Sequence, residues 1–188
     1  MIKKIIIFAL FIIGFLYMTL PGPTSISNFS PLPNSLKSDE PGDTYQVPNV
    51  AAYFSQLKRA EIANFYRDNY KKISWMGFLF PPISLNYPPE YARQYIRNEQ
   101  KGTFLEEYVY PLRESVFVNG YEPAVEDEMK KAKRSFIGDH IYINGNFYVS
   151  KTVLRFYPSG IPERLLVYIG MWLAILSIHD LMKRIARE

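Results

Sequence analysis

The 188-residue chain contains no cysteine and only two histidines. The absence of cysteine excludes disulfides, thiol nucleophiles and Cys-ligated zinc or iron–sulfur centres. A domain outside the cell would therefore have to be stable without covalent cross-links. The sequence also lacks a glycine-rich phosphate loop, an HExxH motif, an EF-hand loop and a G-x-S-x-G nucleophile elbow, so it predicts no bound cofactor or metal.

A strong excess of one charge is also missing. The net charge is +4, from 22 basic and 18 acidic residues, and residues 50–160 hold 15 Lys and Arg against 12 Asp and Glu. Proteins that bind nucleic acids usually carry a basic face or stripe. We therefore expect no nucleic-acid partner.

Long hydrophobic runs occur only at the two ends of the chain. Mean hydropathy is −0.12, which excludes a polytopic transporter. Near the C-terminus, Leu165–Met182 lies between Arg164 and the basic residues Lys183 and Arg184. Its 18 residues would form a helix about 27 Å long, close to the thickness of the hydrocarbon core of a bilayer. We predict a transmembrane helix and basic tail over residues 161–188, with Arg164, Lys183 and Arg184 at the membrane interface; a buried core helix is the alternative.

The N-terminal run Ile5–Leu20 follows Lys3 and Lys4. Its 16 residues exceed a usual signal-peptide core and fall short of a usual transmembrane helix. An uncleaved transmembrane anchor over residues 1–20 is favoured, and a cleaved signal peptide stays open. By the positive-inside rule, we expect a double-pass cell-membrane protein in contact with lipids, with both termini cytoplasmic and residues 21–160 outside.

Residues 21–49 contain six prolines, with serine, glycine and aspartate between them. Proline fixes φ and removes a backbone donor, and few apolar residues remain for a core. The composition predicts an extended linker that holds the following domain away from the membrane.

Residues 50–160 are expected to form a small α+β domain of two or three helices and a few antiparallel strands. Helical spacing of apolar residues predicts helix from about residue 49 to Ile73, with a kink or a break between Leu57 and Ile62. Further helices are expected from Pro88 to Gly102 and over Ala124–Arg134. The acidic start of the latter also allows a metal site, which is the less favoured interpretation.

Strands are predicted in the second half of this domain. Thr103–Tyr110 and Leu112–Val118 are rich in aromatic and β-branched residues, although Thr103 and Glu106 could also begin a helix. Asn144-Gly145 lies between strand-forming residues and predicts a hairpin with a type I′ turn over residues 141–149.

The stretch from Ile73 to Ile83 is unusually rich in aromatic residues. It is too short to span a bilayer, so we expect a buried loop or core strand. The alternative is a segment that dips into the lipid interface, in which case Trp75–Phe80 would form a lipid-binding surface with Trp75 at the interface.

Few residues indicate catalysis. His140 is the only histidine of the presumed domain, and Glu106 with Glu107, or either with Glu114, could supply an acid/base pair of carboxylates. Adjacent glutamates on an edge strand more often protect against aggregation.

The absence of a catalytic motif favours a non-catalytic envelope scaffold or accessory subunit that binds another protein or forms a homo-oligomer. The 15 tyrosines agree with this, because tyrosine suits interfaces. A membrane-anchored enzyme that acts on an envelope substrate is the alternative, and a lipid-surface module is a third. In the C-terminal helix, Gly170, Ala174 and Ser177 form a small-residue stripe against which the N-terminal helix could pack.

Overall fold

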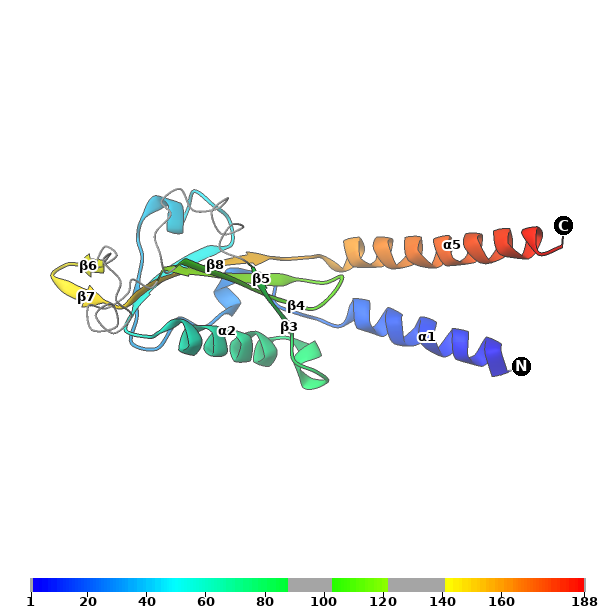
Figure 1. Ribbon diagram of the computed structural model, residues 1–188, viewed down its shortest axis with the longest axis horizontal. Helices are drawn as coiled ribbons and strands as arrows, with labels where there is room; N and C mark the ends of the chain where they lie inside the picture. The colour runs from blue at the N-terminus through cyan, green and yellow to red at the C-terminus, as the bar shows by residue number, and fades with distance from the viewer. Residues whose placement is uncertain (1, 88–102, 122–140, 188) are drawn as a thin grey trace, which may run out of the picture. The chain divides into compact units, whose positions relative to one another are not determined.

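The computed structural model describes residues 2–87, 103–121 and 141–187. The chain divides into two compact units (Figure 1). One is the domain, Gly22–Pro158, and the other is the helix pair, formed by Met1–Pro21 and Ser159–Glu188. Their secondary structure confirms the predicted α+β class.

The domain is built on a six-stranded sheet of order β1-β2-β8-β5-β4-β3, in which every neighbouring pair is antiparallel. A separate hairpin joins β6 and β7. The strands are β1 (Leu36–Lys37), β2 (Val50–Ser55), β3 (Ile83–Tyr87), β4 (Thr103–Val109), β5 (Ser115–Tyr121), β6 (Ile141–Ile143), β7 (Asn146–Tyr148) and β8 (Ser150–Tyr157). The described helices are α1 (Ile2–Thr19), α2 (Arg59–Ile73), α5 (Ile161–Ile185) and the 3₁₀ helices η1 (Ile26–Asn28), η2 (Pro41–Asp43) and η3 (Trp75–Phe78).

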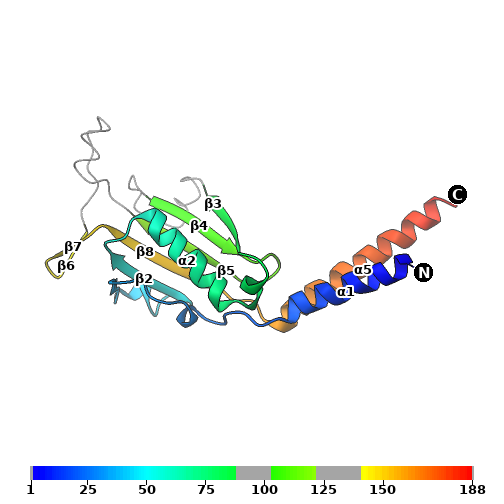
Figure 2. The same ribbon diagram turned by 90° about the horizontal axis from the view of Figure 1, so that it is seen from below.

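Helix α2 covers one face of the sheet (Figure 2). Ile62, Tyr66 and Tyr70 are four residues apart, so they share one side of the helix, and all three are buried. The Tyr70 hydroxyl donates to the Glu114 carbonyl at 2.6 Å, and the Tyr108 hydroxyl oxygen lies 2.8 Å from the Ala63 carbonyl oxygen. The core therefore combines apolar packing with hydrogen bonds from tyrosines.

The predicted helix over residues 49–73 is correct only in its second half. Val50–Ser55 is strand β2, which is paired with β1 on one side and β8 on the other. The apolar run that looked helical belongs to a strand with neighbours on both sides, and residues 51–55 are all buried. Such strands do not show the alternation of a half-exposed strand, so their pattern resembles that of a buried helix.

Residues 22–49 belong to the domain, contrary to the predicted linker. Phe29 is buried, with its ring 5.7 Å from that of Tyr70 and 5.3 Å from that of Phe156. Leu32 is also buried, and β1 adds a short strand to the edge of the sheet. A few well-placed apolar side chains thus hold a proline-rich segment that composition alone assigned to solvent.

The predicted strands of the second half are confirmed. β4 and β5 pair along their whole length, and the turn between them contains Leu112 with φ 61°. The hairpin has Asn144 and Gly145 at φ 52° and 79°, as a type I′ turn requires. Residues 88–102 and 124–134, where two helices were predicted, lie outside the described residues.

In the helix pair, α1 and α5 lie side by side, and the two chain termini lie at the same end of the pair (Figures 1 and 2). Among the described helices, α5 is the one long and apolar enough to cross a membrane. The apolar part of α1, Lys4–Thr19, is shorter. The structure thus agrees with membrane association through the C-terminal helix.

Candidate interaction surfaces

Glu106 and Glu107 do not form a carboxylate pair. As successive residues of β4 they lie on opposite faces of the sheet. On the α2 side, Glu106 accepts hydrogen bonds from Arg59 at 3.1 and 3.2 Å and from the Tyr108 hydroxyl at 2.7 Å. On the other face, Glu107 accepts a hydrogen bond from the Tyr87 hydroxyl. Burial, followed by the hydrogen bond to Glu106, raises the pKa of Tyr108.

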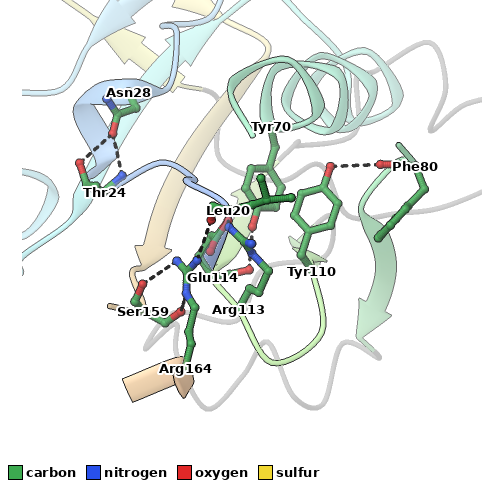
Figure 3. Close-up of polar contacts among 10 residues, drawn as sticks. All are labelled: Leu20, Thr24, Asn28, Tyr70, Phe80, Tyr110, Arg113, Glu114, Ser159 and Arg164. Atoms are coloured by element: carbon green, nitrogen blue, oxygen red, sulfur yellow. Dashed lines mark hydrogen bonds and ion pairs between the residues drawn. The ribbon is translucent and has the colours of Figure 1, made fainter. Parts of the chain in front are cut away.

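Glu114 is engaged in a separate place. Its carboxylate lies 3.4 Å from the Arg113 guanidinium, and both side chains are fully buried at the β4–β5 turn (Figure 3). Gly22 packs so closely that a Cβ there would lie 2.8 Å from the carboxyl carbon of Glu114. The pair therefore holds the start of the domain against this turn. His140 lies outside the described residues.

The sheet face opposite α2 carries a pocket of about 380 Å³. Its wall is mostly apolar, with Asn119 and Arg155 among the polar residues. The Arg155 guanidinium lies 4.9 Å from the centre of the Tyr157 ring. The Oδ1 atom of Asn119 is buried and accepts no hydrogen bond from the described residues. The pocket is lined by Gly42, Asp43, Val47, Val50, Leu105, Phe117, Asn119, Val153, Arg155 and Tyr157.

One rim of the pocket is fixed by a small polar network. Asp43 of η2 accepts hydrogen bonds from Ser38 at 2.6 Å and from Lys151 of β8 at 2.8 Å. Lys151 also lies 2.8 Å from Glu40. Burial lowers the pKa of Lys151, but the bonds to Asp43 and Glu40 outweigh it, so the pKa is raised overall. The network ties residues 38–43 to the sheet.

The sequence did not identify this pocket. The one sequence signal for the pocket is the alternation along β5 and β8. Every second residue is buried under α2, and the residues between them lie on the opposite face of the sheet. Phe117 and Asn119 of β5, and Val153 and Arg155 of β8, lie on this second face. Their assembly into one wall depends on strand pairing between distant parts of the chain.

The stretch around Trp75 differs from the favoured expectation of a buried segment. Trp75, Phe78 and Leu79 expose 65%, 93% and 66% of their surface, whereas Met76 is buried. The reason is Gly77: its Cα approaches the last turn of α2 so closely that an added Cβ would lie 2.9 Å from the Cα of Lys71. This contact buries Met76 and leaves its neighbours in solvent.

Of the residues expected at the membrane interface, Arg164 is buried and hydrogen-bonded. It donates to the Ser159 hydroxyl at 2.8 Å, the Ser159 carbonyl at 2.6 Å and the Leu20 carbonyl at 3.4 Å (Figure 3). It thus links the first turn of α5 to the end of α1. Lys183 and Arg184 are exposed near the other end of α5.

The contact between α1 and α5 is centred on Tyr168, not on the small-residue stripe. The Tyr168 hydroxyl donates to the Phe11 carbonyl at 2.5 Å, and the two rings lie 5.6 Å apart. Gly14 of α1 gives the ring room, because a Cβ there would lie 2.8 Å from it. Gly170 has no atom within 4 Å of an added Cβ, so the predicted role of the stripe is wrong at this residue.

No family model, no curated protein and no solved structure matches the chain.

Proposed function

We propose that the chain is a double-pass membrane protein in which α1 and α5 both cross the bilayer. At 1.5 Å per residue, the 25 residues of α5 extend about 37 Å and the 18 residues of α1 about 27 Å, against a hydrocarbon core of about 30 Å. The antiparallel contact through Tyr168 supports this arrangement. Basic residues at both termini favour a cytoplasmic location for both ends and a location outside the membrane for Gly22–Pro158.

We infer that the domain is a non-catalytic scaffold or accessory module that binds another protein. The observation that carries this inference is the apolar pocket on the sheet face opposite α2. A pocket of this size accepts one or two apolar side chains of a partner, which is how binding energy is usually concentrated in a protein interface.

The polar residues of the pocket suit recognition better than catalysis. Among the described lining residues, the ionisable side chains that could move a proton or stabilise charge are Asp43, Arg155 and Tyr157. Asp43 is already held by Ser38 and Lys151, and Arg155 lies over Tyr157. General acid/base catalysis needs an acid and a base that both reach the substrate, and these contacts do not provide such a pair.

The same residues indicate the chemistry of the partner. The buried Oδ1 of Asn119 requires a donor, because an unsatisfied buried acceptor costs about 1–3 kcal/mol. A backbone N–H or an indole N–H of an inserted aromatic segment would supply it. Arg155 at the exposed side of the pocket can donate to a backbone carbonyl or a carboxylate of the same segment.

Site-specific photo-crosslinking in membranes tests this proposal. A photoreactive amino acid at Tyr157, which lines the pocket, should form an adduct with another protein. The matched control is Tyr142, which is 63% exposed on the β6–β7 hairpin away from the pocket, and should form none. A Tyr157 adduct that disappears in a Val153→Glu variant supports the pocket as the site. No adduct at Tyr157, equal adducts at both positions, or an adduct that contains only copies of this chain would contradict the proposal.

A further inference from the structure

Four large apolar side chains lie exposed on two neighbouring loops of the domain. Trp75, Phe78 and Leu79 belong to η3 and the residue after it, and Leu112, 52% exposed, belongs to the β4–β5 turn. The loops are in contact, because the Tyr110 hydroxyl donates to the Phe80 carbonyl at 3.4 Å (Figure 3). We refer to Trp75, Phe78, Leu79 and Leu112 as the apolar end. Soluble surfaces rarely expose such a cluster without a binding role.

Strand register shows where the apolar end lies: at the side of the sheet formed by the ends of four strands, not along an edge strand. Ile83 pairs with Val109, Val109 with Ser115, and Ser115 with Tyr157. The start of β3, the end of β4, the start of β5 and the end of β8 therefore coincide. The loop that precedes β3, the turn between β4 and β5, and the exit of the chain after β8 all emerge there (Figure 2).

The exit after β8 leads directly to the helix that can span a membrane. Three residues separate Tyr157, the last residue of β8, from Ile161, the first residue of α5. Even fully extended, this connection covers at most about 14 Å. When α5 is in a bilayer, the short connection alone keeps these strand ends close to the headgroup region. The argument requires α5 only, and it does not depend on whether α1 also crosses the membrane.

We propose that the apolar end is a lipid-contact surface that inserts into the interface of the membrane that holds α5. Trp and Phe favour this zone, because their rings are apolar and their edges tolerate the polar headgroups. The exposed Lys71 and Lys72 lie in the last turn of α2, just before Trp75, and add an attraction for anionic phospholipids. The contact holds these strand ends against the bilayer. The sheet face that carries the pocket stays available to a partner. It goes beyond the proposed partner binding and stands independently of it.

The experiment uses the full chain in vesicles and the fluorescence of Trp75. The chain has two tryptophans, so a Trp172→Phe variant leaves Trp75 as the single reporter. In vesicles of phosphatidylcholine with phosphatidylglycerol, Trp75 should be quenched by lipids brominated near the carbonyl region. Quenching by aqueous acrylamide should be at least about threefold weaker than for free tryptophan.

A matched control places the reporter near the opposite strand ends of the sheet. In a variant with Trp75→Phe, Trp172→Phe and Tyr142→Trp, the reporter lies on the hairpin that precedes the start of β8, and acrylamide but not brominated lipid should quench it. Lys71→Gln with Lys72→Gln should reduce lipid quenching of Trp75 when phosphatidylglycerol is present, towards its value in phosphatidylcholine alone.

Two results would overturn the proposal. One is Trp75 fully accessible to acrylamide and untouched by brominated lipid in both kinds of vesicle. The other is Trp75 shielded from acrylamide yet not quenched by lipid, which would mean that protein, including a second copy of this chain, covers the apolar end. Lipid quenching that is the same in both kinds of vesicle and insensitive to the lysine substitutions would overturn the anionic preference. Near-ultraviolet circular dichroism of each variant identifies any that fails to fold.

Discussion

Replacing Gly77 by alanine should destabilise the domain far more than the same change elsewhere. An added Cβ would lie 2.6 Å from the carbonyl carbon and 2.9 Å from the Cα of Lys71, and closer still to the carbonyl oxygen. Carbon atoms pack at about 3.5–4.0 Å, so η3 and the end of α2 would have to separate by about 1 Å. Because the opposing atoms are backbone, no side-chain rotation relieves the clash.

The magnitude follows from the usual cost of overpacking. Such changes cost about 1–3 kcal/mol, and a backbone clash belongs at the upper end, about 3 kcal/mol. For a domain of this size that corresponds to a fall in Tm of roughly 10 °C. The assay is thermal unfolding of the full chain in mild detergent, followed by near-ultraviolet circular dichroism, to which the 15 tyrosines contribute.

The control for this prediction is Gly42→Ala. Gly42 has no atom within 4 Å of an added Cβ, so the free energy of unfolding should change by less than about 0.5 kcal/mol. A Tm for Gly77→Ala within about 2 °C of the Gly42→Ala value would refute the reasoning, because it would mean that η3 is not packed against α2 as described.

Three further predictions concern the pocket rim, alkaline pH and the helix pair. Lys151→Met removes the cation beside Asp43, which is largely buried, and should cost about 1–2 kcal/mol in chemical unfolding; an unchanged unfolding midpoint would argue against the rim network. The pKa values of Lys151 and Tyr108 are raised above 10.5 and 10.0, so the stability they provide is complete below pH 10 and is lost as the pH rises further. Tm should therefore fall as the pH rises from about 10 to about 11.5, and a constant Tm over that range would be inconsistent with these shifts. Gly14→Leu should push the Tyr168 ring away and reduce crosslinking between cysteines introduced into α1 and α5, whereas Gly170→Leu should leave crosslinking unchanged.

Local patterns predicted the local elements of the fold. Asn144-Gly145 predicts the hairpin because positive φ is needed at both turn positions. The β-branched and aromatic residues of Thr103–Tyr110 and Leu112–Val118 predict the two strands found there. The spacing of Ile62, Tyr66 and Tyr70 predicts α2, because one face of this helix is buried and the other is exposed to solvent.

Other features of the fold depend on packing between parts of the chain that are far apart in the sequence. The sequence of β2 predicts a helix because its buried residues do not alternate with exposed ones. Its strand conformation depends on pairing with β1 and β8. Phe29 and Leu32 are buried although they lie in a proline-rich segment, and Phe29 packs against the rings of Tyr70 and Phe156, far along the chain. The pocket likewise joins Val50 to Tyr157 through register, which no local pattern contains.

Exposure of the apolar end was the hardest feature to predict. The run Trp75–Phe80 has the composition of a core segment, and core burial was the favoured expectation. One close backbone contact, between Gly77 and Lys71, accompanies its outward position: Met76 beside it is buried, whereas Trp75 and Phe78 are exposed. A glycine within an aromatic run was the only sequence signal of that contact.

The orientation of the chain in the membrane is the central claim, and single-cysteine labelling tests it directly because the native chain contains no cysteine. Cysteines would be introduced one at a time at Tyr142 in the domain and at Ile2 and Arg187 near the termini, and right-side-out membrane vesicles would be treated with an impermeant maleimide. The double-pass arrangement predicts labelling of Tyr142→Cys in sealed vesicles, and labelling of Ile2→Cys and Arg187→Cys only after permeabilisation. Labelling of Ile2→Cys in sealed vesicles would contradict it, because α1 would then not cross the membrane beside α5.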